Sequence, residues 1–133
     1  MEGVGSRYRD MIEEEELNEW VFVWSKNHIS LNQWYSSTHW SNRVKLKRDW
    51  GFIFLNLLRK YKPFKLEKYE ILLQFNSRLD TSNTIPMIKI FEDFLKKEGV
   101  IIDDNKQYAK RIILEPSDEL PKFTYKLTLK KVK

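Results

Sequence analysis

The sequence has 133 residues, of which 41% are apolar and 14% aromatic, and this composition fits one compact domain with a substantial core. It contains no cysteine, which excludes disulfides, thiolate metal sites and thiol nucleophiles and agrees with an intracellular, cytoplasmic location. The longest apolar run, GFIFLNLL, is far shorter than the roughly 20 residues that cross a membrane, so no membrane association is expected.

The net charge of +5 is unevenly distributed along the chain. Residues 1–20 hold seven acidic and two basic side chains, a net charge of −5, so residues 21–133 carry +10. A basic body suits a polyanionic partner, because lysine and arginine displace the counterions that condense on phosphates. We treat residues 1–19 as an acidic N-terminal segment and residues 20–133 as the domain. The segment is either a solvated helix or a mask over the basic face that DNA displaces.

The first predicted strand is EWVFVWS, residues 19–25. Its apolar side chains alternate to both sides, so we expect it to be buried on both faces. Residues 26–43 show no sustained period and are rich in Asn and Ser, which predicts a long loop. Apolar residues then recur every three or four positions from Val44 to about Lys62, which predicts a helix that Pro63 ends.

The second predicted strand is LEKYEILLQFN, residues 66–76, which alternates in hydrophobicity. The helix after it has Asn83 or Thr84 as its N-cap, accommodates Pro86 in its first turn and ends at Gly99. Its predicted buried stripe consists of Ile85, Ile88, Phe91 and Leu95.

Two further strands are predicted in YAKRIILE and FTYKLTLKK, residues 108–115 and 123–131, with the turn-like PSDELP between them. The resulting order is β-α-β-α-β-β. This order predicts a single α+β domain in which helices pack on a mixed β-sheet.

Carboxylates flank the second predicted helix: Asp80 precedes it, and Asp103 and Asp104 follow it. If these side chains converge, they form an oxygen-rich site of the kind that magnesium prefers, because this hard ion takes carboxylates and accepts phosphate oxygens from a substrate. The alternative is two acidic turns with no shared ligand, since aspartates are common in turns.

Cations and aromatic rings are interleaved where the long loop meets the first helix. Cations contact phosphates and flat rings stack on unpaired bases, so this pattern predicts nucleic-acid binding. The tryptophans could instead anchor the loop to the core. The predicted DNA-binding residues are Arg43, Lys45, Lys47, Arg48, Trp34, Tyr35 and Trp40.

The run Asp80-Thr81-Ser82-Asn83, followed by a helix and by GVIIDD (residues 99–104) opening a strand, resembles the core of the RusA family of Holliday junction resolvases. LNQWYSSTHWSNRVKLKRDW, residues 31–50, resembles the polar, basic approach to the first helix of many phage-type members. The resemblance covers roughly residues 20–129, including the order of the elements. It implies a RusA-like nuclease domain over residues 20–133.

Members of that family are dimeric endonucleases that use Mg²⁺ or Mn²⁺ to make paired nicks in four-way DNA junctions. The resemblance therefore implies a homodimer with a role in recombination, repair or phage DNA processing, in a bacterial cell or a phage-infected host. Asp80, Asp103 and Asp104 match the family's carboxylates and are the implied catalytic residues and metal ligands. Asn83 matches the family's asparagine.

Two positions depart from the family's pattern. Ser82 stands where the family has its second aspartate, and a neutral hydroxyl is a weaker cation ligand than a carboxylate. Pro86 stands where the family has a lysine, which removes a cation that could contact phosphate. Lys89, nearly one helical turn further on, either reaches back toward the site or lies on the solvated face. Three functions stay open: an active junction endonuclease, a junction-binding relative that no longer cleaves, and an unrelated basic nucleic-acid-binding module.

Overall fold

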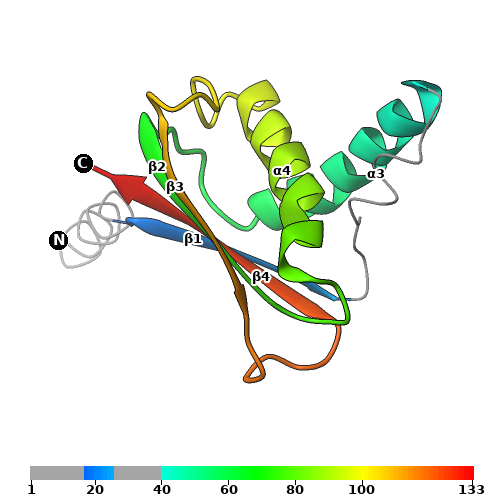
Figure 1. The fold of residues 1–133 in the computed structure, drawn as a ribbon. Helices are drawn as coiled ribbons and strands as arrows, with labels where there is room; N and C mark the ends of the chain where they lie inside the picture. The colour runs from blue at the N-terminus through cyan, green and yellow to red at the C-terminus, as the bar shows by residue number, and fades with distance from the viewer. Residues whose placement is uncertain (1–16, 26–39) are drawn as a thin grey trace, which may run out of the picture.

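The computed structural model describes residues 17–25 and 40–133, with side chains in the second range described from Arg43 onward (Figure 1). The predicted order β-α-β-α-β-β is confirmed, with a short 3-10 helix in addition. The elements are β1 (Glu19–Ser25), α3 (Trp40–Leu58), β2 (Lys68–Asn76), the 3-10 helix η1 (Thr81–Thr84), α4 (Ile85–Lys97), β3 (Ala109–Pro116) and β4 (Thr124–Val132).

The four strands form one mixed sheet in the order β1-β4-β2-β3. β4 pairs antiparallel with β1 and with β2, whereas β2 and β3 are parallel. A parallel pair needs a crossover connection, and η1 and α4 provide it. Both α3 and α4 lie on the same face of the sheet (Figure 1). The predicted α+β domain, a mixed sheet with helices packed on it, is therefore confirmed.

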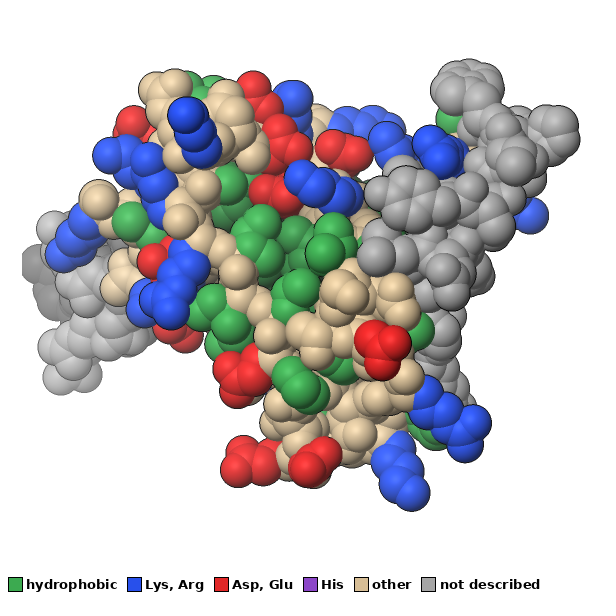
Figure 2. Space-filling view, viewed as in Figure 1, with side chains coloured by type: hydrophobic (Ala, Val, Ile, Leu, Met, Phe, Trp, Pro, Cys, Tyr) green, Lys and Arg blue, Asp and Glu red, His purple; other side chains and the backbone are tan. Residues whose placement is uncertain are grey.

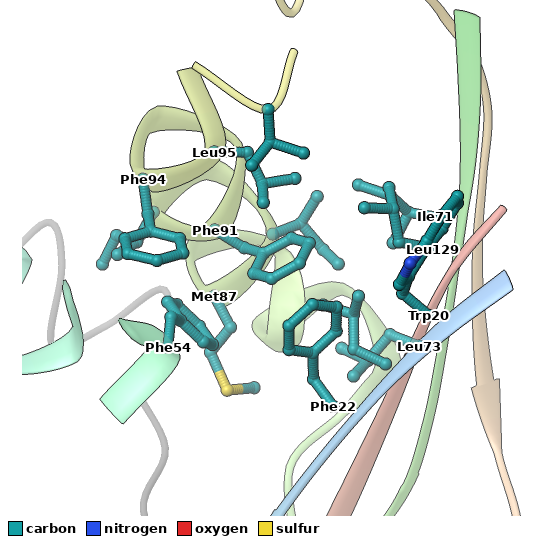
Figure 3. Close-up of a cluster of buried hydrophobic side chains, with 14 of the residues drawn as sticks. Trp20, Phe22, Phe54, Ile71, Leu73, Met87, Phe91, Phe94, Leu95 and Leu129 are labelled. Atoms are coloured by element: carbon teal, nitrogen blue, oxygen red, sulfur yellow. The ribbon is translucent and has the colours of Figure 1, made fainter. Parts of the chain in front are cut away.

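The core lies between the two helices and the covered face of the sheet, and aromatic rings fill its centre (Figure 3). Phe91 of α4 meets Phe22 of β1 and Phe54 of α3 edge to face, with ring centroids 5.0 Å apart in both pairs. All three rings are fully buried. Burying each such ring contributes roughly 1.5–3 kcal/mol to folding, so this cluster holds both helices on the sheet.

Strand β1 is buried on one face only. Trp20, Phe22 and Trp24 point into the core, whereas Val23 on the opposite face is 45% exposed. The prediction that both faces are buried is therefore wrong. The reason is that α3 and α4 cover one side of the sheet and neither lies on the other side (Figure 1).

Helix α3 begins at Trp40 rather than at Val44 and ends at Leu58, before Pro63 is reached. It therefore includes the last residues of the predicted loop, whose remaining residues, 26–39, lie outside the described part of the chain. The predicted apolar face of the helix does turn toward the core, with Trp50 and Phe54 fully packed there.

Helix α4 buries Ile88, Phe91 and Leu95 as predicted, but Ile85 is 38% exposed. Ile85 is the first residue of α4 and faces solvent, whereas its neighbours Thr84 and Pro86 are buried. Thr84 is the N-cap, although its hydroxyl donates to the carbonyl of Thr81 at 2.7 Å instead of capping the helix.

Candidate functional site

Asp80 lies beyond the end of β2, at the start of η1. Its carboxylate makes no capping hydrogen bond, while its backbone carbonyl accepts a hydrogen bond from the amide of Asn83 at 2.9 Å. Asp80 and Ser82 are exposed and Asn83 is half-buried. This turn therefore presents a carboxylate, a hydroxyl and an amide at the surface.

Asp103 and Asp104 lie in the loop between α4 and β3, and they do not open a strand as predicted. Ile101 forms an isolated parallel bridge with Leu66, which precedes β2, and the chain joins the sheet only when β3 begins at Ala109. Both aspartates are half-buried in this loop.

The carboxylate of Asp103 is held by local contacts. Its Oδ1 accepts a hydrogen bond from the backbone amide of Asp104 at 2.8 Å and lies 3.1 Å from Nζ of Lys96. The hydrogen bond from the Asp104 amide and the ion pair with Lys96 hold the pKa of Asp103 below its usual value. The same ion pair raises the pKa of Lys96. Asp103 is therefore engaged by a lysine of α4.

A buried pair, Glu92 of α4 and Tyr69 of β2, lies close to this loop. The hydroxyl of Tyr69 donates to Oε2 of Glu92 at 2.5 Å, and Glu92 is only 1% exposed. Burial raises the pKa of Glu92, while the bond from Tyr69 and the charge of Lys89 oppose that rise. The negative charge of Asp104 raises the pKa of Glu92 further.

Sequence reasoning missed Glu92 because a glutamate in a helix normally faces water. The signal that could have found it is its position four residues after Ile88, on the same side of α4 as the predicted buried stripe. Among the described residues, its Oε1 has no hydrogen-bond partner.

The predicted carboxylates lie at opposite ends of the domain. Helix α4 separates Asp80 from Asp104, and its 13 residues span about 20 Å at ~1.5 Å per residue (Figure 1). Strand β2 separates them in the same way. Tyr69, near its start, donates its amide to the carbonyl of Tyr108 at 2.9 Å, on the side of Asp104, whereas Asp80 follows its other end.

Two carboxylates that share one Mg²⁺ must bring oxygens to within roughly 4–5 Å of each other, because each bond to the ion is about 2.1 Å long. The structure therefore does not bring Asp80 together with Asp103 and Asp104 within one copy of the chain. Across residues 17–25 and 40–133, no three His, Cys, Asp or Glu side chains lie close enough to hold a metal ion. Within one copy of the chain, these carboxylates therefore do not form the shared site for Mg²⁺ or Mn²⁺ that the resemblance implies, and the metal stays a prediction.

Lys89 is exposed on α4, and its charge acts on Glu92. Asp80 precedes the N-terminal end of α4, and Glu92 lies about two turns further along this helix. Lys89 thus sits on the solvated face, within electrostatic reach of the buried carboxyl group.

Three of the predicted DNA-binding cations, Lys45, Lys47 and Arg48, are exposed on α3, while Arg43 is half-buried. Nζ of Lys47 lies 3.2 Å from Oδ2 of Asp93 on α4. Both side chains of this ion pair are about half exposed, so it contributes little to stability and leaves the lysine accessible to a partner.

The three predicted aromatic contacts cannot be placed in the same way. Trp34 and Tyr35 lie outside the described residues, and Trp40 begins α3 with a side chain that is not described. The predicted stacking surface therefore stays a prediction.

A second group of cations follows α3, and sequence reasoning missed it. The run RKYKPFK, residues 59–65, contains four exposed cations interleaved with two aromatic rings. Such interleaving is itself a nucleic-acid-binding signal and could have been found from the sequence. The cations are Arg59, Lys60, Lys62 and Lys65.

Residues 43–65 together carry eight basic side chains and one acidic side chain, Asp49. Figure 2 shows lysine and arginine side chains on the side of the molecule where α3 lies and also on the opposite side, with acidic and basic side chains mixed around α4. We call residues 43–65 the basic stretch. Its charge is suited to a polyanion.

No protein-family model matches the chain, and no curated protein matches it at a significant level. The RusA resemblance thus rests on short sequence runs and stays a prediction. In the described part of the chain, each helix is too short or too polar to cross a membrane.

Proposed function

We propose that this chain binds DNA through the basic stretch, and that four-way junctions are the class of DNA that it prefers. The observation that carries the proposal is the charge of residues 43–65, a net +7 over one helix and the turn after it. Helix α3 alone has 19 residues and extends about 28 Å, enough to follow several phosphates along a duplex. The choice of junctions rests on the RusA resemblance.

Binding without cleavage is the form of this function that the geometry supports best. Asp80 is separated from Asp104 by the length of α4, and Ser82 and Pro86 already replace two polar groups of the family's pattern. The metal-dependent nuclease, its Mg²⁺ or Mn²⁺ and the homodimer stay proposals that rest on the resemblance.

The test offers the protein a synthetic four-way junction and a linear duplex of the same sequence, in EDTA and then with Mg²⁺ or Mn²⁺. We expect tighter binding to the junction than to the duplex in EDTA, and no symmetric nicks when either metal is added. Binding is expected to be the same in Asp80→Asn and Asp104→Asn, because neither residue lies in the basic stretch.

Two other outcomes would contradict this proposal. Symmetric nicks that disappear in both aspartate variants would show an active resolvase. Equal and weak binding to junction and duplex, lost as salt is raised, would show an unrelated basic module without a preference for branched DNA.

A further inference from the structure

A pocket of about 650 Å³ lies where α3 ends, between the turn of residues 59–65 and the start of the loop after α4. Its inner wall is apolar and includes Leu58, Phe64 and Val100. Exposed cations line its outer part. We call this cavity the basic pocket. Its volume falls within the range of roughly 300–1,000 Å³ that small-molecule sites occupy.

We propose that the basic pocket binds one unpaired nucleotide of the DNA held by the basic stretch, with the base against Phe64 and the phosphate on the surrounding cations. This inference rests on the proposed DNA binding and names the part of the substrate that this region recognises. It is carried by the ring geometry, by the charge of the pocket and by the contacts that fix its walls.

The aromatic wall of the pocket is held rigidly in place. The ring of Phe64 stacks on Trp20, with centroids 4.1 Å apart and planes within 4°. Tyr61 meets Phe64 edge to face at 6.5 Å. The hydroxyl of Tyr61 donates to the carbonyl of Val21 at 3.0 Å and accepts from the amide of Val21 at 2.8 Å. A base entering the pocket therefore meets a preformed surface and pays little to order it.

The opposite wall is joined to the first by the backbone. The amide of Leu66 donates to the carbonyl of Val100 at 2.7 Å, which ties the turn after α3 to the chain leaving α4. Gly99 also lines the pocket, and apart from its chain neighbours no atom of the described residues lies within 4 Å of the position that a Cβ would take there. The backbone at Gly99 is thus open to a flat ligand.

The charge of the pocket suits a phosphate. Among the described residues, Arg59, Lys62 and Lys65 line it together with one carboxylate, that of Glu98. The pocket combines buried and half-buried apolar residues with exposed cations, a combination that matches a nucleotide better than a free phosphate ion or a purely apolar ligand. Aromatic side chains beside cations are the usual means of binding unpaired bases, at roughly 1–3 kcal/mol per stacked base.

The test compares a duplex with a short single-stranded tail and the same duplex with blunt ends. The tail carries 2-aminopurine, whose fluorescence falls when the base stacks on a ring. We expect the wild-type protein to quench this fluorescence and to bind the tailed duplex more tightly. Phe64→Leu is expected to abolish the quenching and to weaken tailed-duplex binding by roughly 5- to 150-fold, with blunt-duplex binding unchanged.

Three further variants make the result specific. Phe123→Leu removes a ring that is 47% exposed just before β4, outside both the pocket and the basic stretch, and is expected to behave as wild type. Phe64→Tyr keeps the ring and should retain quenching. Lys65→Gln changes an exposed side chain and is expected to weaken tailed-duplex binding by roughly 2- to 5-fold. This variant keeps the test decisive if Phe64→Leu does not fold.

Failure of this inference can be distinguished from failure of the proposed function. If the wild-type protein binds neither duplex, DNA binding itself is wrong. If it binds both equally, without quenching, only the pocket assignment is overturned. Binding of a free 2-aminopurine nucleoside monophosphate as tightly as the tailed duplex would also overturn it, because the ligand would then be a free nucleotide and not a DNA strand.

Discussion

Glu92 holds a carboxyl group in the core of the domain, with Tyr69 as the partner of one of its two oxygens. A buried carboxyl group with an oxygen that has no partner costs stability, so the bond from Tyr69 matters more than an ordinary surface hydrogen bond. The charge of the nearby Asp104 adds to that cost. This pair couples strand β2 to helix α4 near the loop that holds Asp103 and Asp104.

Tyr69→Phe removes the hydroxyl and leaves Glu92 buried without this partner. We expect a loss of roughly 1–3 kcal/mol in the free energy of unfolding, measured by urea denaturation. In the double variant Tyr69→Phe/Glu92→Leu the polar group is removed from both sides, and stability should return toward that of the wild type. A double variant less stable than Tyr69→Phe alone would contradict this account.

The raised pKa of Glu92 makes stability depend on pH. The folded chain binds the proton of Glu92 more tightly than the unfolded chain does. The contribution of this group to stability is therefore greatest at low pH, and it falls as the pH rises above about 4.3, the pKa of a glutamate in the unfolded chain. The side chain in Glu92→Gln cannot ionise, so this variant should not show that decrease in stability with rising pH.

We therefore expect the stability of Glu92→Gln relative to wild type to increase from pH 4 to pH 7, measured by urea denaturation at each pH. Asp103, whose pKa is lowered, loses its contribution as the pH falls, but it does so in both proteins and cancels in the difference. A difference that stays constant across this range would show that Glu92 ionises normally.

At the scale of the elements, hydrophobic periodicity predicted each strand and helix in order, because alternation and a three-to-four-residue repeat record which face is buried. Periodicity does not record how many faces a sheet has covered, and so β1 was expected to be buried on both. The distance between Asp80 and Asp104 was also not readable from a motif, since both flank the same helix and only the length and direction of α4 separate them.

Helix α4 ends in a way that the sequence did predict. Gly99 follows its last turn with a φ of 77°, in the left-handed region that side chains with a Cβ rarely adopt. No atom blocks a Cβ at this position. The cost of a substitution there is therefore conformational and not steric.

Gly99→Ala is expected to lower the free energy of unfolding by about 1–2 kcal/mol. Gly51→Ala is the matched control, since Gly51 lies inside α3 and also has open space at its Cβ position. Alanine favours a helix interior, so this variant should be more stable than wild type by roughly 0.5–1 kcal/mol. Thermal unfolding of both variants checks the pair. Equal effects of the same sign would contradict the role given to Gly99.

At the scale of the whole molecule, the basic stretch and the carboxyl groups of Asp103 and Glu92 lie on different elements. The basic stretch runs along α3 and the turn after it, whereas Asp103 and Glu92 belong to the other helix and its loop. The proposed DNA-binding surface follows from the net charge, and part of its proposed location follows from the first helix. The turn of residues 59–65 completes it with the basic pocket, which only the fold assembles, because Gly99 and Val100 come from a distant part of the chain.

The salt dependence of DNA binding tests the role of the basic stretch most directly. Each phosphate contact adds about 0.9 to the slope of log binding constant against log salt concentration. The variant Lys45→Gln/Arg59→Gln/Lys60→Gln removes three exposed cations from the basic stretch. The control Lys110→Gln/Arg111→Gln/Lys122→Gln removes three exposed cations on β3 and in the loop after it, at the opposite edge of the sheet from β1, whose Trp20 stacks on Phe64 of the basic stretch.

We predict that the first triple variant reduces the slope for a four-way junction by about 2–3, while the control keeps the wild-type slope. Both variants change the net charge equally, so the comparison isolates position from charge. Equal reductions in the two variants, or no reduction in the first, would show that the basic stretch is not the DNA-binding surface.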